Sequence, residues 1–157
     1  MVALQEPGWA QFLPKGTGVS DSVWGRRHNT MSWIVLVHIP VLYVFWVFMG
    51  LEPLHTLAEV AILAALLVIG RFQAIPRVFR ATSVSLGLLS SSALLVHFSG
   101  GYIEAHFHFF VMLPLVALYQ RWLPFGVAVG FVLFHHGVVG VLDPASVYNH
   151  PSALAHP

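Results

Sequence analysis

The chain has 157 residues, of which 57% are hydrophobic and only 8% are charged, with a formal net charge of +1 and no cysteine. A soluble domain carries about a quarter charged residues, so this composition indicates an integral membrane protein. The lack of cysteine excludes thiolate metal sites and disulfides, and the lack of a basic stripe gives nucleic-acid binding no support.

Residues 1–30 are expected to form a cytoplasmic or interfacial segment that does not cross the membrane. Prolines and glycines would break any long helix here, namely Pro7, Gly8, Pro14, Gly16 and Gly18. Aromatic residues such as Trp9 and Trp24 would rest at the lipid surface. No short apolar core lies near the start, so a cleavable signal peptide is not expected.

Residues 31–142 are predicted to form a bundle of about five transmembrane helices, because five apolar runs each approach the ~20 residues that a crossing helix needs. The expected spans are residues 31–50, 54–70, 81–98, 103–119 and 123–142. The connections between them are short and leave no room for a separate soluble domain. The predicted fold class is therefore an all-α integral membrane protein.

The distribution of arginine and lysine predicts the orientation in the membrane. All 7 of these residues fall before the first span, between the second and third spans, or between the fourth and fifth spans. They therefore all lie on the same side of the membrane. This side should be cytoplasmic, which puts the N-terminus in the cytoplasm and residues 143–157 in an extracytoplasmic tail. Five spans leave the termini on opposite sides, so a cytoplasmic output domain is expected to require a sixth span beyond this chain.

Polar residues within the spans suggest a metal site near the extracytoplasmic face. Ionisable side chains are costly inside a bilayer and usually pair or bind something. Imidazole and carboxylate groups from facing helices build metal sites in helical bundles, and together they suit copper, zinc or iron. The spacing i, i+4 puts Glu104 and His108 on one helix face, as it does His55 and Glu59. The candidate metal ligands are Glu104, His108 and His136, followed by His106, His135, His97 and Glu59.

His38 suggests a different cofactor. It lies about two turns into the first span, shortly before Pro40, where it is too deep for the outer histidines. Two histidines from facing helices can ligate haem iron axially, and the candidates for such a haem b site are His38, His108 and His136. Each histidine taken singly can also be a hydrogen-bonding core residue.

Four short stretches stand out: Ser-Gly-Gly-Tyr-Ile-Glu-Ala-His-Phe-His-Phe-Phe-Val at 99–111, Leu-Tyr-Gln-Arg-Trp at 118–122, His135-His136, and Val-Tyr-Asn-His-Pro at 147–151. Together with His38-Ile39-Pro40, they resemble a family of His-rich membrane sensor modules found N-terminal to bacterial diguanylate cyclases, histidine kinases and chemoreceptors. The resemblance covers most of residues 28–157. It implies an input domain in a bacterial inner (plasma) membrane that senses an extracytoplasmic or membrane-borne cue, with a cytoplasmic signalling output domain outside this chain.

Three functions follow as alternatives. The favoured one is a membrane sensor that holds a transition metal or metal cofactor and signals when altered ligation tilts its helices. The second is a b-type haem protein for gas sensing, redox sensing or electron transfer, which a Soret band would distinguish. The third is a metal-dependent membrane enzyme with Glu104 or Glu59 as general base, although a sensor or binding module is favoured over an enzyme. The lipid bilayer is an expected partner, and the sequence leaves a homodimer open.

Overall fold

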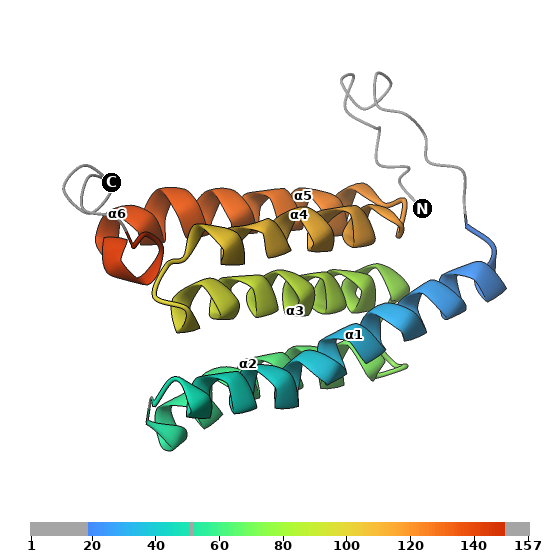
Figure 1. Ribbon diagram of the computed structural model, residues 1–157. Coiled ribbons are helices and arrows are strands. Elements are labelled where there is room, and N and C mark those ends of the chain that lie inside the picture. Colours follow the sequence, from blue (N-terminus) through green and yellow to red (C-terminus); the bar gives the residue numbers. More distant parts are fainter. Residues whose placement is uncertain (1–18, 51, 150–157) are drawn as a thin grey trace.

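The structure, a computed structural model, describes residues 19–50 and 52–149, and it is helical throughout these ranges apart from turns (Figure 1). The long elements are α1 (Asp21–Phe48), α2 (Pro53–Arg71), α3 (Arg77–Phe98), α4 (Ile103–Ala117) and α5 (Trp122–Leu133). α5 continues through a π-helical turn, η2 (Phe134–Val139), into α6 (Gly140–Leu142), and the 3-10 turn η3 (Pro144–Ser146) follows. In the described ranges 4 helices, counting α5 to α6 as one, are long and apolar enough to cross a membrane, and α4 is a shorter apolar helix. The predicted all-α architecture is confirmed.

Helix α1 begins earlier than the sequence predicts, at Asp21 rather than at residue 31. No proline interrupts residues 21–30, and the carboxylate of Asp21 lies in the first turn, where it is favourable to the helix dipole. A helix of 28 residues is about 42 Å long, which exceeds the ~30 Å hydrocarbon core. A helix of this length crosses the apolar layer either with a tilt or with one end beyond it.

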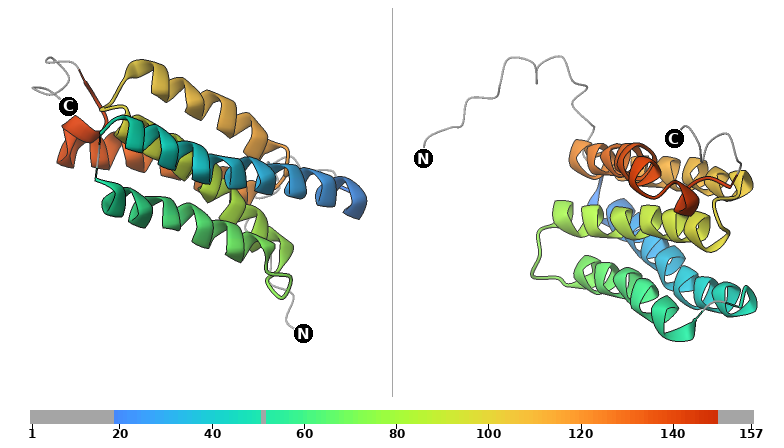
Figure 2. Two further views of the ribbon diagram at one scale, coloured as in Figure 1. Left: turned by 60° about the horizontal axis from the view of Figure 1, so that its bottom comes forward. Right: turned by 90° about the vertical axis from the view of Figure 1, so that its left-hand side faces the viewer.

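The helices pack in three layers, with α3 in the middle, α1 and α2 on one side, and α4 and α5 on the other (Figures 1 and 2). In its most apolar stretch 61% of α3 is buried, against 28% or less for the other three candidate spans, so α3 is the central helix. Small residues let its neighbours approach closely. A Cβ atom on Gly87 would lie 3.2 Å from both methyl groups of Val35 on α1.

The bundle has two chemically different ends. The basic end comprises the start of α1, the α2–α3 connection and the α4–α5 connection, and it carries Arg26, Arg27, Arg71, Arg77, Arg80 and Arg121. The histidine end comprises the start of α2, the end of α3, the start of α4 and the π-helical end of α5. The described chain enters at the basic end and leaves at the histidine end (Figure 1). This segregation is the one that the distribution of arginine predicts, whereas the assignment of the basic end to the cytoplasm stays a prediction.

At the basic end, a buried histidine joins three parts of the fold. The Nε2–H of His28 on α1 donates to the carbonyl of Gly70 at 2.9 Å, since a carbonyl can only accept. In the neutral ring the other nitrogen then accepts, and the hydroxyl of Tyr119 donates to Nδ1 at 2.8 Å. The ring of Trp24 stacks on His28 at 4.5 Å. His28, which is 3% exposed, is therefore packed within the helical bundle.

A substitution at Gly101 tests whether Tyr148, near the end of the described chain, packs against the α3–α4 turn. It has a φ of +79°, and a Cβ atom there would lie 2.7 Å from the backbone N and C atoms of Tyr148. Gly101→Ala should lower the free energy of unfolding by about 3 kcal/mol, because left-handed strain and a backbone clash add together. Unfolding in detergent, followed by tryptophan fluorescence, would measure this loss.

Gly100→Ala is the matched control for this substitution. Gly100 has a φ of +70° with no atom within 4 Å of the added Cβ, so only the strain of about 1–2 kcal/mol applies. Equal losses for the two variants would contradict the packing of Tyr148 on this turn.

Candidate metal site at the histidine end

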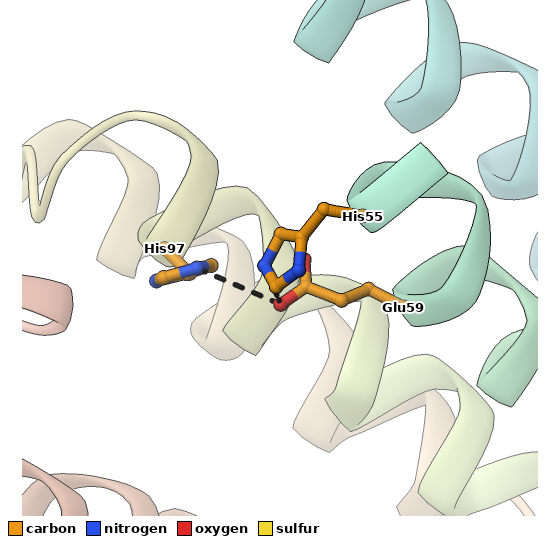
Figure 3. A group of neighbouring side chains, drawn as sticks. All are labelled: His55, Glu59 and His97. Atoms are coloured by element: carbon orange, nitrogen blue, oxygen red, sulfur yellow. Dashed lines mark ion pairs between the residues drawn. The ribbon is translucent and has the colours of Figure 1, made fainter. Parts of the chain in front are cut away.

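Three side chains from two helices converge at the histidine end (Figure 3). One ligand atom each from His55, Glu59 and His97 lies within 4.8 Å of the other two. The Nε2 atom of His55 lies 3.3 Å from Glu59 Oε1, and the Nε2 atom of His97 lies 3.6 Å from the same oxygen. We call these residues the His55–Glu59–His97 group.

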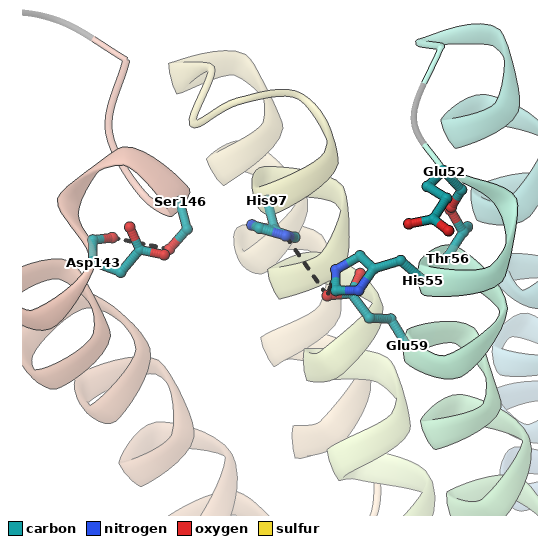
Figure 4. Close-up of polar contacts among 7 residues, drawn as sticks. All are labelled: Glu52, His55, Thr56, Glu59, His97, Asp143 and Ser146. Carbon is teal, nitrogen blue, oxygen red and sulfur yellow. Dashed lines mark hydrogen bonds and ion pairs between the residues drawn. The ribbon is translucent and has the colours of Figure 1, made fainter.

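Local structure explains the convergence. Helix α2 begins at Pro53, whose missing N–H and fixed φ suit the first position of a helix. His55 and Glu59 both lie in the first two turns of this helix, one turn apart on the same face. His97 lies in the last turn of α3. Because α2 and α3 are antiparallel neighbours, the first turns of α2 lie beside the last turn of α3 (Figure 4).

Helix α1 supplies an apolar wall to the group. The indole of Trp46 is 3% exposed, and its ring lies 5.8 Å from the ring of His55 and 5.7 Å from that of His97. Phe98 meets the same indole edge-on at 3.5 Å. The indole therefore covers one side of both imidazoles, whereas the His55 side chain remains 59% exposed and that of His97 37% exposed.

One oxygen of the carboxylate is left without a partner. Glu59 Oε2 is buried and accepts no hydrogen bond from any residue that the structure describes, while Oε1 faces both imidazoles. Within residues 19–50 and 52–149, no arginine or lysine pairs with Glu59. A carboxylate at an apolar helix end thus lacks a full cationic counterpart, which a bound cation would supply.

The spacing of the group suits a metal ion. Tetrahedral zinc with bonds of about 2.0–2.1 Å holds adjacent ligand atoms roughly 3.3 Å apart. The separations of 3.3 and 3.6 Å between each imidazole and Glu59 Oε1 are close to this value, and all three ligand atoms lie within 4.8 Å of one another. Three protein ligands would leave a fourth position open to water or to a small ligand.

Two of the sequence-predicted ligands, Glu59 and His97, belong to this group, and His55 is an additional member. The i, i+4 spacing of His55 and Glu59 already indicated that they share a face. The spacing was therefore the signal that could have added His55 to the predicted ligands beside Glu59.

Three other predicted ligands form a second cluster around the π-helical turn, comprising His106, His135 and His136. The ring of His136 lies 5.3 Å from that of His106 and 5.0 Å from that of His135. His106 Nδ1 donates to the carbonyl of Tyr102, and His136 Nδ1 donates to that of Val132, both at 3.0 Å. His106 Nε2 and His135 Nδ1 are buried without a partner among the described residues. Two members of this second histidine cluster, His135 and His136, lie on a π-helix, a feature that is frequent at functional sites, and His106 lies on α4.

His108 pairs with His38 deeper in the bundle. The two Nε2 atoms lie 3.1 Å apart, and the Nδ1 atom of His38 donates to the Ile34 carbonyl at 2.7 Å. In the neutral pair His108 Nε2–H therefore donates to His38, and the hydroxyl of Ser92 donates to His108 Nδ1 at 2.8 Å. This pair joins α1, α3 and α4.

Glu104 stands apart from these clusters. It is exposed in the first turn of α4 and lines an open cavity with Tyr102, Ile103 and Asn149. Among the described residues, it belongs to no group with ligand atoms close enough to share a metal. His150 and His156 lie outside the described residues.

Comparison with known proteins gives one informative match. The chain is 37% identical over 161 aligned residues to the transducer protein Htr8 of Halobacterium salinarum. The alignment covers 95% of this chain and 25% of the relative, so the chain spans about a quarter of the length of the protein it matches. No protein-family profile matches the chain, and no solved structure matches it.

The relative is archaeal, whereas the sequence resemblance is to bacterial modules. Nearly the whole chain is therefore similar to one part of a transducer protein, which supports a sensor module linked to signalling in a membrane.

Proposed function

We propose that the chain is the membrane-embedded input domain of a transducer, and that it binds a transition metal ion through His55, Glu59 and His97. The observation that carries the proposal is the convergence of these three ligand atoms within 4.8 Å from two helices. Two imidazoles and a carboxylate form a donor set that suits zinc, copper or iron. The buried, unpartnered Glu59 Oε2 favours the same conclusion.

A metal ion here would act on the relative position of two helices. It would hold the start of α2 against the end of α3, and its release would let these ends separate. Helix α2 ends beside Gly70, whose carbonyl accepts from His28 of α1 at the basic end. A change of ligation can therefore bias helix packing at the basic end, which an output domain would reach after the expected sixth span. The relative's name and greater length support such an output domain.

Metal binding to the purified protein tests the proposal. The protein in detergent, stripped with a chelator, is titrated with Zn²⁺, Cu²⁺ or Fe²⁺, and bound metal is counted by elemental analysis. We expect one equivalent for the wild type and none for His97→Ala, which removes the only ligand from α3. His136→Ala is the control, because it alters the second histidine cluster alone. Loss of metal in His136→Ala but not in His97→Ala would move the site to that cluster and contradict the proposal.

A haem b site at His38 and His108 is the second candidate. The Nε2 atoms of the two imidazoles face each other, and hydrogen bonds to Ile34 and Ser92 orient both rings, as outer partners orient metal ligands. Axial bonds of ~2.0 Å would require about 4 Å between the nitrogens, so α1 and α4 would have to separate beyond the present 3.1 Å. A Soret band that His108→Ala abolishes would favour this candidate, and a colourless protein with one equivalent of metal would favour the first.

A further inference from the structure

Two cavities adjoin at the basic end, away from the metal site. The first has a volume of 170 Å³, which is room for about five water molecules at ~30 Å³ each. It opens between the start of α1 and the α2–α3 connection, and its lining is polar or aromatic: Trp24, Gly25, His28, Asn29, Arg71, Gln73 and Arg80. Both amide and guanidinium donors therefore surround this space.

No carboxylate of the described residues pairs with the two guanidinium groups of this polar cavity. Arg71 donates to the side-chain oxygen of Asn29 at 2.8 Å, and Arg80 donates to the Gly70 carbonyl at 3.0 Å. Neither guanidinium has a carboxylate partner in the described part of the chain, whereas Arg77 forms an ion pair with Asp21. Guanidinium groups bind phosphate oxygens through charge-assisted hydrogen bonds. The polar cavity thus has the donors and the charge for a phosphate group.

The second cavity is mostly apolar and shares a residue with the first. It has a volume of 150 Å³ and is lined by Ser32, Trp33, Leu36, Leu67 and Arg71. Leu67 precedes Arg71 by one turn of α2, so the cavity extends about 6 Å from the arginine toward the middle of the bundle. Arg71 stands at the junction of the polar cavity and this apolar groove.

We propose that the two cavities together bind one anionic phospholipid. Its phosphate lies between Arg71 and Arg80, and the beginning of one hydrocarbon chain lies in the groove between α1 and α2. Basic pockets at helix ends recognise lipid head groups in this way. A free phosphate would fill only the polar cavity, and the continuity through Arg71 favours a molecule with both a charged and an apolar part.

Native mass spectrometry of the delipidated protein in mild detergent tests the proposal. Phosphatidylglycerol is added back, and bound lipid is counted against its concentration. We expect one tightly bound molecule, and about fivefold weaker binding for each of Arg71→Gln and Arg80→Gln, since one cation contributes about 1 kcal/mol. Arg26→Gln is the matched control, because Arg26 lies at the same end but lines neither cavity.

Further variants and ligands distinguish binding of the whole lipid from binding of its phosphate group alone. Leu36→Trp, which fills the groove, should weaken binding of phosphatidylglycerol but not of its water-soluble dihexanoyl form. Arg71→Lys should restore part of the affinity that Arg71→Gln loses, which excludes a misfolded variant. Equal binding by the wild type, Arg71→Gln and Arg26→Gln would overturn the proposal. Tight binding of inorganic phosphate with no gain from a long-chain lipid would overturn the role of the groove.

Discussion

Glu59→Gln should weaken binding of a divalent transition metal by more than about 100-fold. Loss of a residue that only hydrogen-bonds to a metal ligand already lowers metal affinity by about 10–100-fold. Glu59 is proposed as a direct ligand, so its loss should lower the affinity further. The amide keeps the size of the side chain but removes the charge that faces both imidazoles at 3.3 and 3.6 Å. Calorimetric titration of the chelator-stripped protein in detergent measures the change.

Two matched substitutions serve as controls for Glu59→Gln. Glu52→Gln removes an exposed carboxylate just before the start of α2, beside the group but outside it (Figure 4). Glu104→Gln removes the carboxylate that the sequence ranks first among the candidate ligands. Both should bind metal as the wild type does. The opposite result, loss of metal binding in Glu104→Gln and full binding in Glu59→Gln, would contradict the proposal. It would favour the ligands expected from the sequence, and the His55–Glu59–His97 group would then be only an ion-pair cluster.

Removal of the buried hydrogen bonds of His28 should produce a large loss of stability. His28→Leu keeps a buried side chain of similar size but leaves the hydroxyl of Tyr119, which is 1% exposed, without its partner. The carbonyl of Gly70 keeps only the bond from Arg80. An unsatisfied buried group costs about 1–3 kcal/mol, so we expect the free energy of unfolding to fall by about 3 kcal/mol once the lost stacking on Trp24 is included.

Tyr119→Phe isolates one bond of this network. It removes the donor to His28 Nδ1 and should cost about 1–2 kcal/mol in the same unfolding measurement. Tyr102→Phe, at a ring that is 53% exposed, should change stability by less than about 0.5 kcal/mol. In a double-mutant cycle the losses at positions 28 and 119 should be less than additive, because both variants remove the same bond. Fully additive losses would show that the bond does not hold α1 to the α4–α5 connection.

Amino-acid order alone accounts for the helical class, the approximate spans and the separation of arginines from histidines. Runs of apolar residues fix these features because the backbone in a bilayer must satisfy its hydrogen bonds within each helix. The shared face of His55 and Glu59 also follows from periodicity, since residues four apart lie one above the other. The start of α1 did not follow, because its first turns are held by the contacts of His28 and Trp24 with distant parts of the chain.

The choice of partners among the polar residues depended on tertiary structure. Periodicity gives the angle between side chains on one helix, but not the rotation of that helix against its neighbours. Packing around α3 turned His97 toward Glu59 and paired His108 with His38 instead of with the outer histidines. The π-helical turn altered the regular spacing, so the rings of His135 and His136 both lie against Phe109 of α4. Only the packed bundle decides which ionisable groups meet, because the partners of a polar group inside a bilayer must come from neighbouring helices and not from water.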